Sequence, residues 1–276
     1  MNDLSDKVVL VTGSTDGIGR ETARILAERG AHVILHGRRE NRCREAVKYI
    51  HRRVAEARLD YIVLDLCEMN RIRSIGSMVG AVTNRLDVLI NNAGVGPGQH
   101  GQEREVTPDG YELRFAVNHL APFALTRELL PFLQAGGDVR IVNVTSAAQA
   151  PLDFDDLMMA GEFDPMRAYS RSKLAMVMFT IDLAAHLANS GITVNCLHPG
   201  SLLDTKMVRE TFGAARGSAE VGARNEVYLA TSPDLDGVTG EYFDEARRRR
   251  PHEQALDEAA RRRLWEVSEE LTGVHY

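Results

Sequence analysis

Residues 7–19 read KVVLVTGSTDGIG, and this stretch decides the fold that we expect. Its first half is a short apolar run rich in β-branched residues, which is typical of a strand buried on both faces. Its second half places Gly13, Gly17 and Gly19 in a turn that leads directly into a helix, predicted over about 17–29. The stretch therefore predicts a strand–turn–helix unit whose turn is rich in glycine.

Strands and helices alternate along the rest of the chain, up to the end of the apolar pattern near Phe243. Strands are predicted at 7–12, 31–36, 61–64, 87–90, 139–144 and 193–197, and helices at 17–29, 41–57, 68–84, 109–133 and 167–189. This alternation implies a parallel sheet built from right-handed crossovers. We expect an α/β fold: a single doubly wound Rossmann-type domain with a mostly parallel seven-stranded sheet and helices on both faces.

No internal repeat or low-complexity linker interrupts this series. We therefore expect one domain over 1–243, including a substrate lid near 201–218, and a C-terminal helical extension over 244–276 packed on the same domain. The lid segment combines apolar residues with glycine and alanine, a composition that suits a mobile cover. The arginine runs at 247–250 and 261–263 lie among acidic residues, which favours a solvated helix over a nucleic-acid site.

Composition and charge exclude several classes of function. The formal net charge of −6 argues against nucleic acid as a partner. No apolar run is long enough to span a bilayer, and the N-terminus lacks the apolar core of a signal peptide, so we expect no membrane partner. Cys43, Cys67 and Cys196 are scattered without metal-ligand spacing, so we expect no metal site. Unpaired thiols predict a cytoplasmic location.

Glycines at a strand-to-helix turn let the backbone approach a pyrophosphate, whose charge is met by free N–H groups and the helix dipole. The spacing here is Gly-x-x-x-Gly-x-Gly, and its position favours nucleotide binding over an ordinary turn. The second strand ends at Gly37, followed by Arg38 and Arg39. A carboxylate there would bind a ribose 2′-hydroxyl, whereas arginine accommodates a 2′-phosphate, so the pair favours NADP over NAD. The alternative is that both arginines are merely solvated.

Polar residues recur where later strands end. Asp65 could cap the next helix or contact an adenine amino group, and Asn92 could form a turn or line a ligand site at the carboxyl edge of the sheet. Ser146 could be a cap or could bind a substrate oxygen. Asn118 lies in an apolar helical stretch, where a buried amide must find partners.

Tyr169 and Lys173 stand four residues apart on a predicted helix and therefore share one face. A phenol titrates near about pH 10, and a nearby cation lowers that pKa, which would make Tyr169 a general acid or base. Taken alone, a tyrosine and a lysine at this spacing are more often ordinary surface residues without a catalytic role.

Together these residues resemble the classical short-chain dehydrogenase/reductase family over nearly the whole length, from Lys7 to about Phe243. The resemblance rests on TGSTDGIG at 12–19, NNAG at 91–94, Asn118, Ser146, Tyr169 with Lys173, and Pro199-Gly200, in the family's order. TPDGYE at 107–112, VNHL at 117–120, LHPG at 197–200 and LWEVSEEL at 264–271 resemble its retinol-dehydrogenase-like branch.

The resemblance implies that Asn118, Ser146, Tyr169 and Lys173 are catalytic. Tyr169 would exchange the proton, and Lys173 would lower its pKa and bind the nicotinamide ribose. Ser146 would hold the substrate oxygen, and Asn118 would position a water that links Lys173 to solvent. The implied cofactor-binding residues are Gly13, Ser14, Thr15, Asp16, Gly17, Ile18, Gly19, Arg38, Arg39, Asp65, Leu66, Asn92, Ala93, Gly94, Tyr169, Lys173, Pro199 and Gly200.

Two positions depart from the family pattern. Many NADP-dependent members carry a basic residue where this chain has Asp16, which leaves Arg38, with Ser14 and Arg39, to hold a 2′-phosphate. Thr205 follows Pro199-Gly200 one residue later than is common, which puts its contact with the nicotinamide in question.

The function predicted is that of an NADP(H)-dependent oxidoreductase acting on a small, partly apolar alcohol or ketone. A homo-oligomer is a possible assembly. The alternative is a regulatory or sensor protein that binds NAD(P) and keeps the fold without turnover. The acid–base tyrosine speaks against that alternative, because a binding protein has no need of one.

Overall fold

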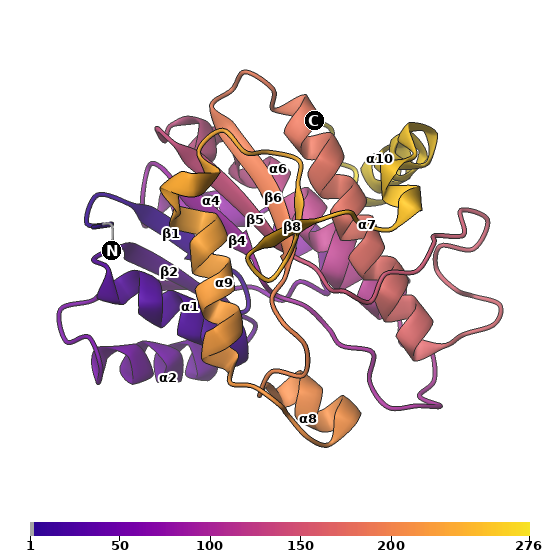
Figure 1. Ribbon diagram of the computed structural model, residues 1–276, viewed down its shortest axis with the longest axis horizontal. Coiled ribbons are helices and arrows are strands. Elements are labelled where there is room, and N and C mark those ends of the chain that lie inside the picture. Colours follow the sequence, from indigo (N-terminus) through magenta and orange to yellow (C-terminus); the bar gives the residue numbers. More distant parts are fainter. Residues whose placement is uncertain (1–2) are drawn as a thin grey trace.

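The strands form one sheet in the order β3-β2-β1-β4-β5-β6-β7-β8 (Figure 1). The structure is a computed structural model that describes residues 3–276; residues 1 and 2, which the domain prediction includes, lie outside the described residues. The strands are β1 (Val8–Val11), β2 (His32–Gly37), β3 (Arg58–Val63), β4 (Val88–Asn91), β5 (Val139–Val144), β6 (Ile192–His198), β7 (Tyr242–Asp244) and β8 (Arg247–Arg249). All neighbours pair in parallel except β7 and β8, which are antiparallel.

Helices cover both faces of this sheet (Figure 1). Apolar residues of α1 (Gly17–Glu28), α2 (Glu40–His51) and α9 (Ala219–Thr231) form a core with one face. A second core, on the other face, includes α3 (Met69–Ile72), α4 (Ile75–Gly80), α6 (Ala121–Gln134), α7 (Pro165–His186) and α10 (Glu258–Thr272). The remaining helical segments are α5 (Leu113–Phe115), η1 (Ala116–Leu120), α8 (Lys206–Phe212), η2 (Pro233–Leu235) and η3 (Glu253–Leu256). The predicted doubly wound α/β fold is confirmed.

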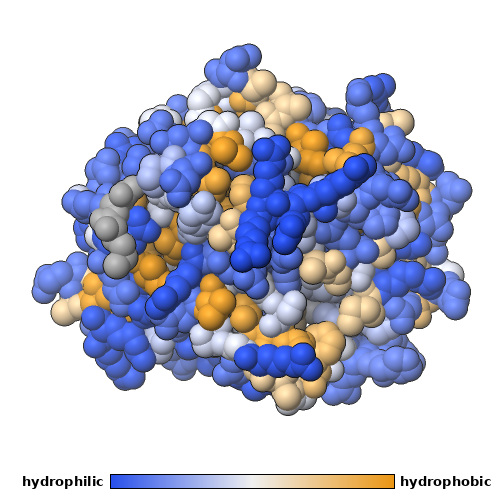
Figure 2. Space-filling model, viewed as in Figure 1, coloured by the Kyte–Doolittle hydropathy of each residue, from blue (hydrophilic) through white to orange (hydrophobic). Residues whose placement is uncertain are grey.

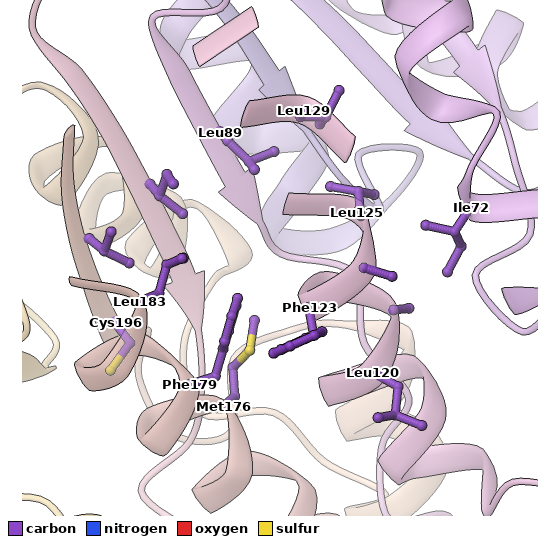
Figure 3. Close-up of a cluster of buried hydrophobic side chains, with 14 of the residues drawn as sticks. Ile72, Leu89, Leu120, Phe123, Leu125, Leu129, Met176, Phe179, Leu183 and Cys196 are labelled. Carbon is purple, nitrogen blue, oxygen red and sulfur yellow. The ribbon is translucent and has the colours of Figure 1, made fainter. Parts of the chain in front are cut away.

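Aromatic side chains join α6, α7 and α10 in the second core. Phe123 of α6 lies beside Phe179 and Met176 of α7 (Figure 3), and the two phenyl centroids are 5.3 Å apart. Trp265 of α10 packs edge-on against Phe123 at 5.1 Å. The C-terminal Tyr276 joins the same cluster and donates a hydrogen bond from its hydroxyl to the carbonyl of Phe123 at 2.7 Å. The aromatic contacts therefore anchor α10 on the domain.

Over the described residues, 3–276, the sheet has eight strands, so the predicted number of seven was one too low. The added strand, β8, consists of exposed arginines from the run that the sequence pattern assigned to a helical extension. Charged residues are typical of edge strands, because they discourage pairing with another chain. Long hydrophilic side chains lie over this region of the molecule (Figure 2). The segment is a strand because it pairs with β7, and no apolar periodicity in its sequence indicates that conformation.

Three predicted helices also differ from the structure. The helix expected over 41–57 ends at His51. The helix expected over 68–84 is divided into α3 and α4. The helix expected over 109–133 begins at Leu113, because Gly110 has a φ of +86° and closes a turn with Thr107. That helix also contains the π-helical turn η1, which includes Asn118. Such turns occur frequently at functional sites.

Candidate active site

The glycine turn connects β1 to α1 at the carboxyl edge of the sheet. Gly13 and Gly17 have φ values of +65° and +56°, a region that favours glycine. Asp16 caps α1 by accepting a hydrogen bond from the N–H of Gly17 at 2.8 Å. Within residues 3–276, the N–H groups of Ile18 and Gly19 have no hydrogen-bond partner. This helix N-terminus therefore offers two free donors and a positive dipole end to an anion.

The N–H of Gly13, which was expected to face a pyrophosphate, is already occupied. It donates to Nδ1 of His36 at 3.1 Å. Asn92 braces the same turn, because its Nδ2 donates to the carbonyls of Thr12 at 2.7 Å and Gly13 at 3.2 Å. A Cβ on Gly13 would lie 2.8 Å from the Cα of Ala93. The turn is thus packed tightly against the end of β4.

The helix α7 begins at Pro165 and is capped by Asp164, whose Oδ1 accepts a hydrogen bond from the N–H of Arg167. It presents Tyr169 and, one turn later, the buried Lys173. The Lys173 ammonium lies 5.8 Å from the centre of the Tyr169 ring and donates to the carbonyl of Val144 at 2.9 Å. Burial lowers the pKa of Lys173 to about 8.

The pKa of Tyr169 moves in the direction opposite to the one predicted. Burial of the phenol raises the pKa, and a hydrogen bond from the Ser146 side chain opposes this effect without overcoming it. Lys173 does not lower the pKa because its ammonium is directed to the Val144 carbonyl rather than to the phenol oxygen. In this state the Tyr169 hydroxyl keeps its proton at neutral pH.

Asn118 has partners for its whole amide. Its Oδ1 accepts from the N–H of Val95 at 2.7 Å, and its Nδ2 donates to the carbonyl of Val95 at 3.0 Å and to the hydroxyl of Ser172 at 2.9 Å. A Cβ on Gly94 would lie 3.1 Å from this Oδ1 and 3.3 Å from the Lys173 ammonium. The amide therefore links the segment after β4 to α7, beside Lys173.

One cleft of about 360 Å³ connects these features. The predicted site residues that line it are Gly13, Thr15, Asp16, Gly17, Ile18, Gly19, Arg38, Asp65, Leu66, Asn92, Ala93, Gly94, Tyr169, Lys173 and Pro199. Asn118, Ser146 and Gly200 lie next to lining residues. Ser14 is fully buried, donating to the carbonyl of Val11 and accepting from the N–H of His36, and Arg39 is exposed at the N-cap of α2. The structure brings neither of these two into the cleft.

Lys206 and Met207, from the lid predicted over 201–218, and Val95, the first residue of a segment expected to form another wall of the substrate site, also line the cleft. The sequence interpretation missed several further lining residues: His36, Gly37, Leu64, Cys67, Val117, Val144 and Thr145. Most of them follow or end a buried strand, a position that could have identified them. Thr205, whose role was left open, also lines the cleft, and its methyl group would lie 3.3 Å from a Cβ on Gly17.

The charge of Asp16 is shared with two arginines. Its carboxylate lies 3.7 Å from the guanidinium of Arg20 and 3.7 Å from that of Arg42. Arg38 lines the cleft nearby. The negative charge of Asp16, the residue that departs from the family pattern, is therefore offset by the positive charges of these neighbouring arginines.

A family model described as short chain dehydrogenase matches residues 7–215. The chain belongs to the short-chain dehydrogenase family. Retinol dehydrogenase 13 from Homo sapiens is 38% identical over 97% of this chain and 85% of that protein, and polyprenol dehydrogenase from Homo sapiens is 34% identical over 98% and 86%. These similarities place this short-chain dehydrogenase in the retinol-dehydrogenase-like branch, as the sequence predicted. It is a nicotinamide-dependent oxidoreductase acting on CH–OH groups.

Solved structures agree with this family assignment. The crystal structure of an uncharacterised protein from Mycobacterium paratuberculosis has a TM-score of 0.80 and 29% identity, and the match covers 100% of this chain and 97% of that one. A short chain dehydrogenase from Shigella flexneri, solved with NADP, has a TM-score of 0.73 and 27% identity over 89% and 100%. Within residues 3–276, no helix combines the length and apolar character needed to cross a membrane.

Proposed function

We propose that this short-chain dehydrogenase uses NADP(H) to interconvert a carbonyl compound and a secondary or primary alcohol, with Tyr169 as the general acid or base. One observation carries the proposal. Tyr169 and Lys173 line the same cleft as the glycine turn, and Ser146 is hydrogen-bonded to the phenol. An anion-binding turn and an acid–base pair in one cleft fit a bound dinucleotide beside a reacting oxygen.

The roles of the side chains follow from their positions. A phenol that keeps its proton can give it to a carbonyl oxygen during reduction and recover it from an alcohol in the reverse direction. The Lys173 ammonium lies 5.8 Å from the centre of the Tyr169 ring and is directed to the Val144 carbonyl, so it would supply positive charge to the cleft and bind the nicotinamide ribose rather than lower the pKa of the phenol. The Ser146 hydroxyl, already at the phenol, would hold the substrate oxygen. The nicotinamide supplies or accepts the hydride when bound.

In this scheme Asn118 takes no part in the proton transfer and instead positions the segments around the cleft. Its amide fixes Val95 and Ser172 through three hydrogen bonds. Ser172 precedes Lys173 on α7, and Val95 lines the cleft. The amide thereby sets the distance between the cleft wall and the helix that carries Tyr169 and Lys173.

The preference for NADP rests on Arg38. This guanidinium lines the cleft directly after β2, where the chain has Arg38 and Arg39 in place of the carboxylate that would bind a ribose 2′-hydroxyl. Arg20 and Arg42 balance Asp16, so its charge is less able to repel a 2′-phosphate. The Shigella flexneri relative was solved with NADP and an Escherichia coli relative with NADPH, at 27% identity each.

The substrate would be a small, partly apolar alcohol or ketone. Val95, Val117 and Met207 contribute apolar side chains to the lining of the cleft that Tyr169 also lines. We also propose 201–218 as a substrate lid, because Met207 and Thr205 from this segment line the cleft. A cytoplasmic location is part of the proposal and is supported by the free thiols of Cys43, Cys67 and Cys196.

Steady-state rates with NADPH and NADH over a panel of apolar ketones, aldehydes and alcohols test the proposal. We expect turnover with NADPH at least about tenfold more efficient than with NADH, because a charged hydrogen bond to a phosphate contributes about 1.5–3 kcal/mol. Equal efficiency with the two cofactors would refute the NADP preference. Tight NADPH binding without turnover of any compound would favour the sensor alternative.

Arg38→Ala and Arg39→Ala form a matched pair for the same test. We expect Arg38→Ala to raise the KM for NADPH by about 10–100-fold and to leave NADH kinetics nearly unchanged. Arg39→Ala removes a neighbouring, exposed guanidinium and should change both by less than about twofold. The reverse ranking would assign the 2′-phosphate to Arg39.

A further inference from the structure

His36 occupies a special position between the glycine turn and the end of β3. It is the penultimate residue of β2, lines the cleft, and is only 3% exposed. Its Nδ1 lies 3.1 Å from the backbone nitrogen of Gly13, and its Nε2 lies 3.1 Å from the carbonyl oxygen of Leu64. The ring therefore spans two segments that both border the cleft.

These two partners determine the state of the ring. A backbone N–H can only donate and a carbonyl can only accept, so Nδ1 must be unprotonated and Nε2 must carry the proton. Burial agrees with this state, because it lowers the pKa of His36 to about 4. The imidazole is neutral at physiological pH, with both nitrogens used.

The backbone of His36 also contacts the glycine turn, through two hydrogen bonds with Ser14. The N–H of His36 donates to the Ser14 hydroxyl at 2.9 Å, and the N–H of Ser14 donates to the His36 carbonyl at 3.0 Å. Ser14 could keep these contacts with any residue at position 36. The contact with the N–H of Gly13, by contrast, is made by the His36 side chain, and Gly13 has a φ of +65° and is packed against Ala93.

We propose that His36 is a positioning residue that sets the glycine turn for the cofactor pyrophosphate, acting through its hydrogen bond with Gly13. This inference rests on the proposed function. By occupying the Gly13 N–H, the imidazole fixes the start of the turn, and the free N–H groups of Ile18 and Gly19 are held at the cleft. The contact with Leu64 keeps the ring in the required tautomer and orientation.

Two amide substitutions separate the two contacts of the ring. His36→Asn places an amide oxygen near the position of Nδ1, so it retains an acceptor for Gly13 and loses the contact with Leu64. His36→Gln places an amide nitrogen near the position of Nε2, so it retains the donor to Leu64 and loses the acceptor for Gly13. His36→Ala removes both contacts.

The dissociation constant of NADPH, measured by its fluorescence on binding, is the main readout. We expect His36→Gln and His36→Ala to weaken binding about tenfold and His36→Asn by less than about threefold, because a buried N–H left without an acceptor destabilises the turn. At saturating NADPH, kcat should stay within about twofold of the wild type in all three, since Tyr169 and Lys173 are untouched. Equal weakening by Asn and Gln would overturn the proposal.

Ile34→Ala is the matched control for a purely structural role. Ile34 is fully buried on the same face of β2, two residues from His36, and belongs to the apolar core rather than to the turn. It should lower the melting temperature without changing NADPH affinity. If affinity follows the melting temperature across all four variants, His36 is structural only and the positioning role is wrong.

Hydrogen exchange of the Gly13 amide, measured by NMR without cofactor, separates this inference from the proposed function. The amide should exchange slowly in the wild type and His36→Asn, and at least about tenfold faster in His36→Gln. Equal exchange in these proteins would overturn the proposed contact whatever the cofactor data show. Slow exchange in a wild type that binds neither NADPH nor NADH would instead refute the proposed function and, with it, any positioning role.

Discussion

The wall of the cleft that carries the glycine turn and the segment 201–218, which we propose as a lid, border the same space but are held in different ways. Thr12 and Ser14 in the turn are almost completely buried, and the side chains of Asn92 and His36 hold the turn by donating to the Thr12 carbonyl and accepting from the Gly13 N–H, respectively. In the lid, α8 has no buried residue. Two backbone hydrogen bonds join the two ends of this segment. The N–H of Asp204 donates to the Gly217 carbonyl at 2.7 Å, and the N–H of Arg216 donates to the Leu202 carbonyl at 2.8 Å.

Leu203 is the main apolar anchor of the lid. It is 5% exposed, and its side chain lies within 3.2 Å of the positions that a Cβ would take on Gly200, Gly217 and Gly222. Gly222 of α9 also faces Ile18 of the glycine turn. The glycine turn and the lid therefore both contact α9 at Gly222. The difference suggests that the wall fixes the geometry of the chemistry, whereas the lid controls access.

The largest effect should come from Tyr169→Phe, which removes one oxygen atom from the side of the cleft that α7 carries. We expect kcat to fall by about 10²–10⁴-fold, because general acid–base catalysis contributes that much. The NADPH dissociation constant should stay within about threefold, since the braced turn is unchanged. Single-turnover rates and a binding titration on the same preparation measure the two quantities. Retained turnover would remove Tyr169 from the mechanism.

A second prediction concerns the interface between α1 and α9, close to the contact of Gly222 with Ile18. Glu226 of α9 is completely buried and accepts a hydrogen bond from the Thr22 hydroxyl at 2.7 Å. Within residues 3–276 its other carboxyl oxygen has no hydrogen-bond partner. Burial raises the pKa of Glu226 to about 8. The folded protein therefore holds a neutral acid there at pH 7.

The sign of the pH dependence follows from that raised pKa. In the unfolded chain Glu226 ionises near its usual pKa of 4.5, so its contribution to stability is complete below that value and is lost as pH rises toward 8. Lys173 is charged in both states below its lowered pKa of about 8, so its contribution stays nearly constant over this window.

Glu226→Gln should remove this pH dependence, because glutamine resembles the neutral acid and can still accept from Thr22. Between pH 5 and 8 the wild type should lose on the order of 3 kcal/mol of unfolding free energy relative to the variant. Urea denaturation of both proteins across this range measures the difference. Glu220→Gln, at a half-buried site on the same helix where the carboxylate pairs with Arg224, should follow the wild type. Parallel curves for wild type and Glu226→Gln would contradict the prediction.

Much of the fold and the site was readable from the sequence because short-range signals determine them. The apolar run before Gly13, the spacing of Tyr169 and Lys173 and the position of Asn118 each have a local physical reason. The contacts that hold the site together have no such signal. His36 meets Gly13 and Leu64, and Thr22 meets Glu226, only through tertiary packing. The strand β8 was missed because an arginine run contains no apolar periodicity, and the pKa direction of Tyr169 depends on burial.

The smallest effect should come from Leu203→Ala, which tests whether the lid controls access alone. Truncation of this anchor should loosen the lid and raise the KM of the carbonyl substrate by about 5–10-fold, equivalent to roughly 1 kcal/mol. The value of kcat and the NADPH dissociation constant should stay within about twofold, because the braced wall is separate. Phe212→Ala is the control, since Phe212 lies on α8 and is 51% exposed; it should leave KM unchanged. If Leu203→Ala instead weakens NADPH binding as much as substrate binding, then Gly222, which lies beside both Leu203 and Ile18, couples the lid to the glycine turn, and the two act as one structural unit.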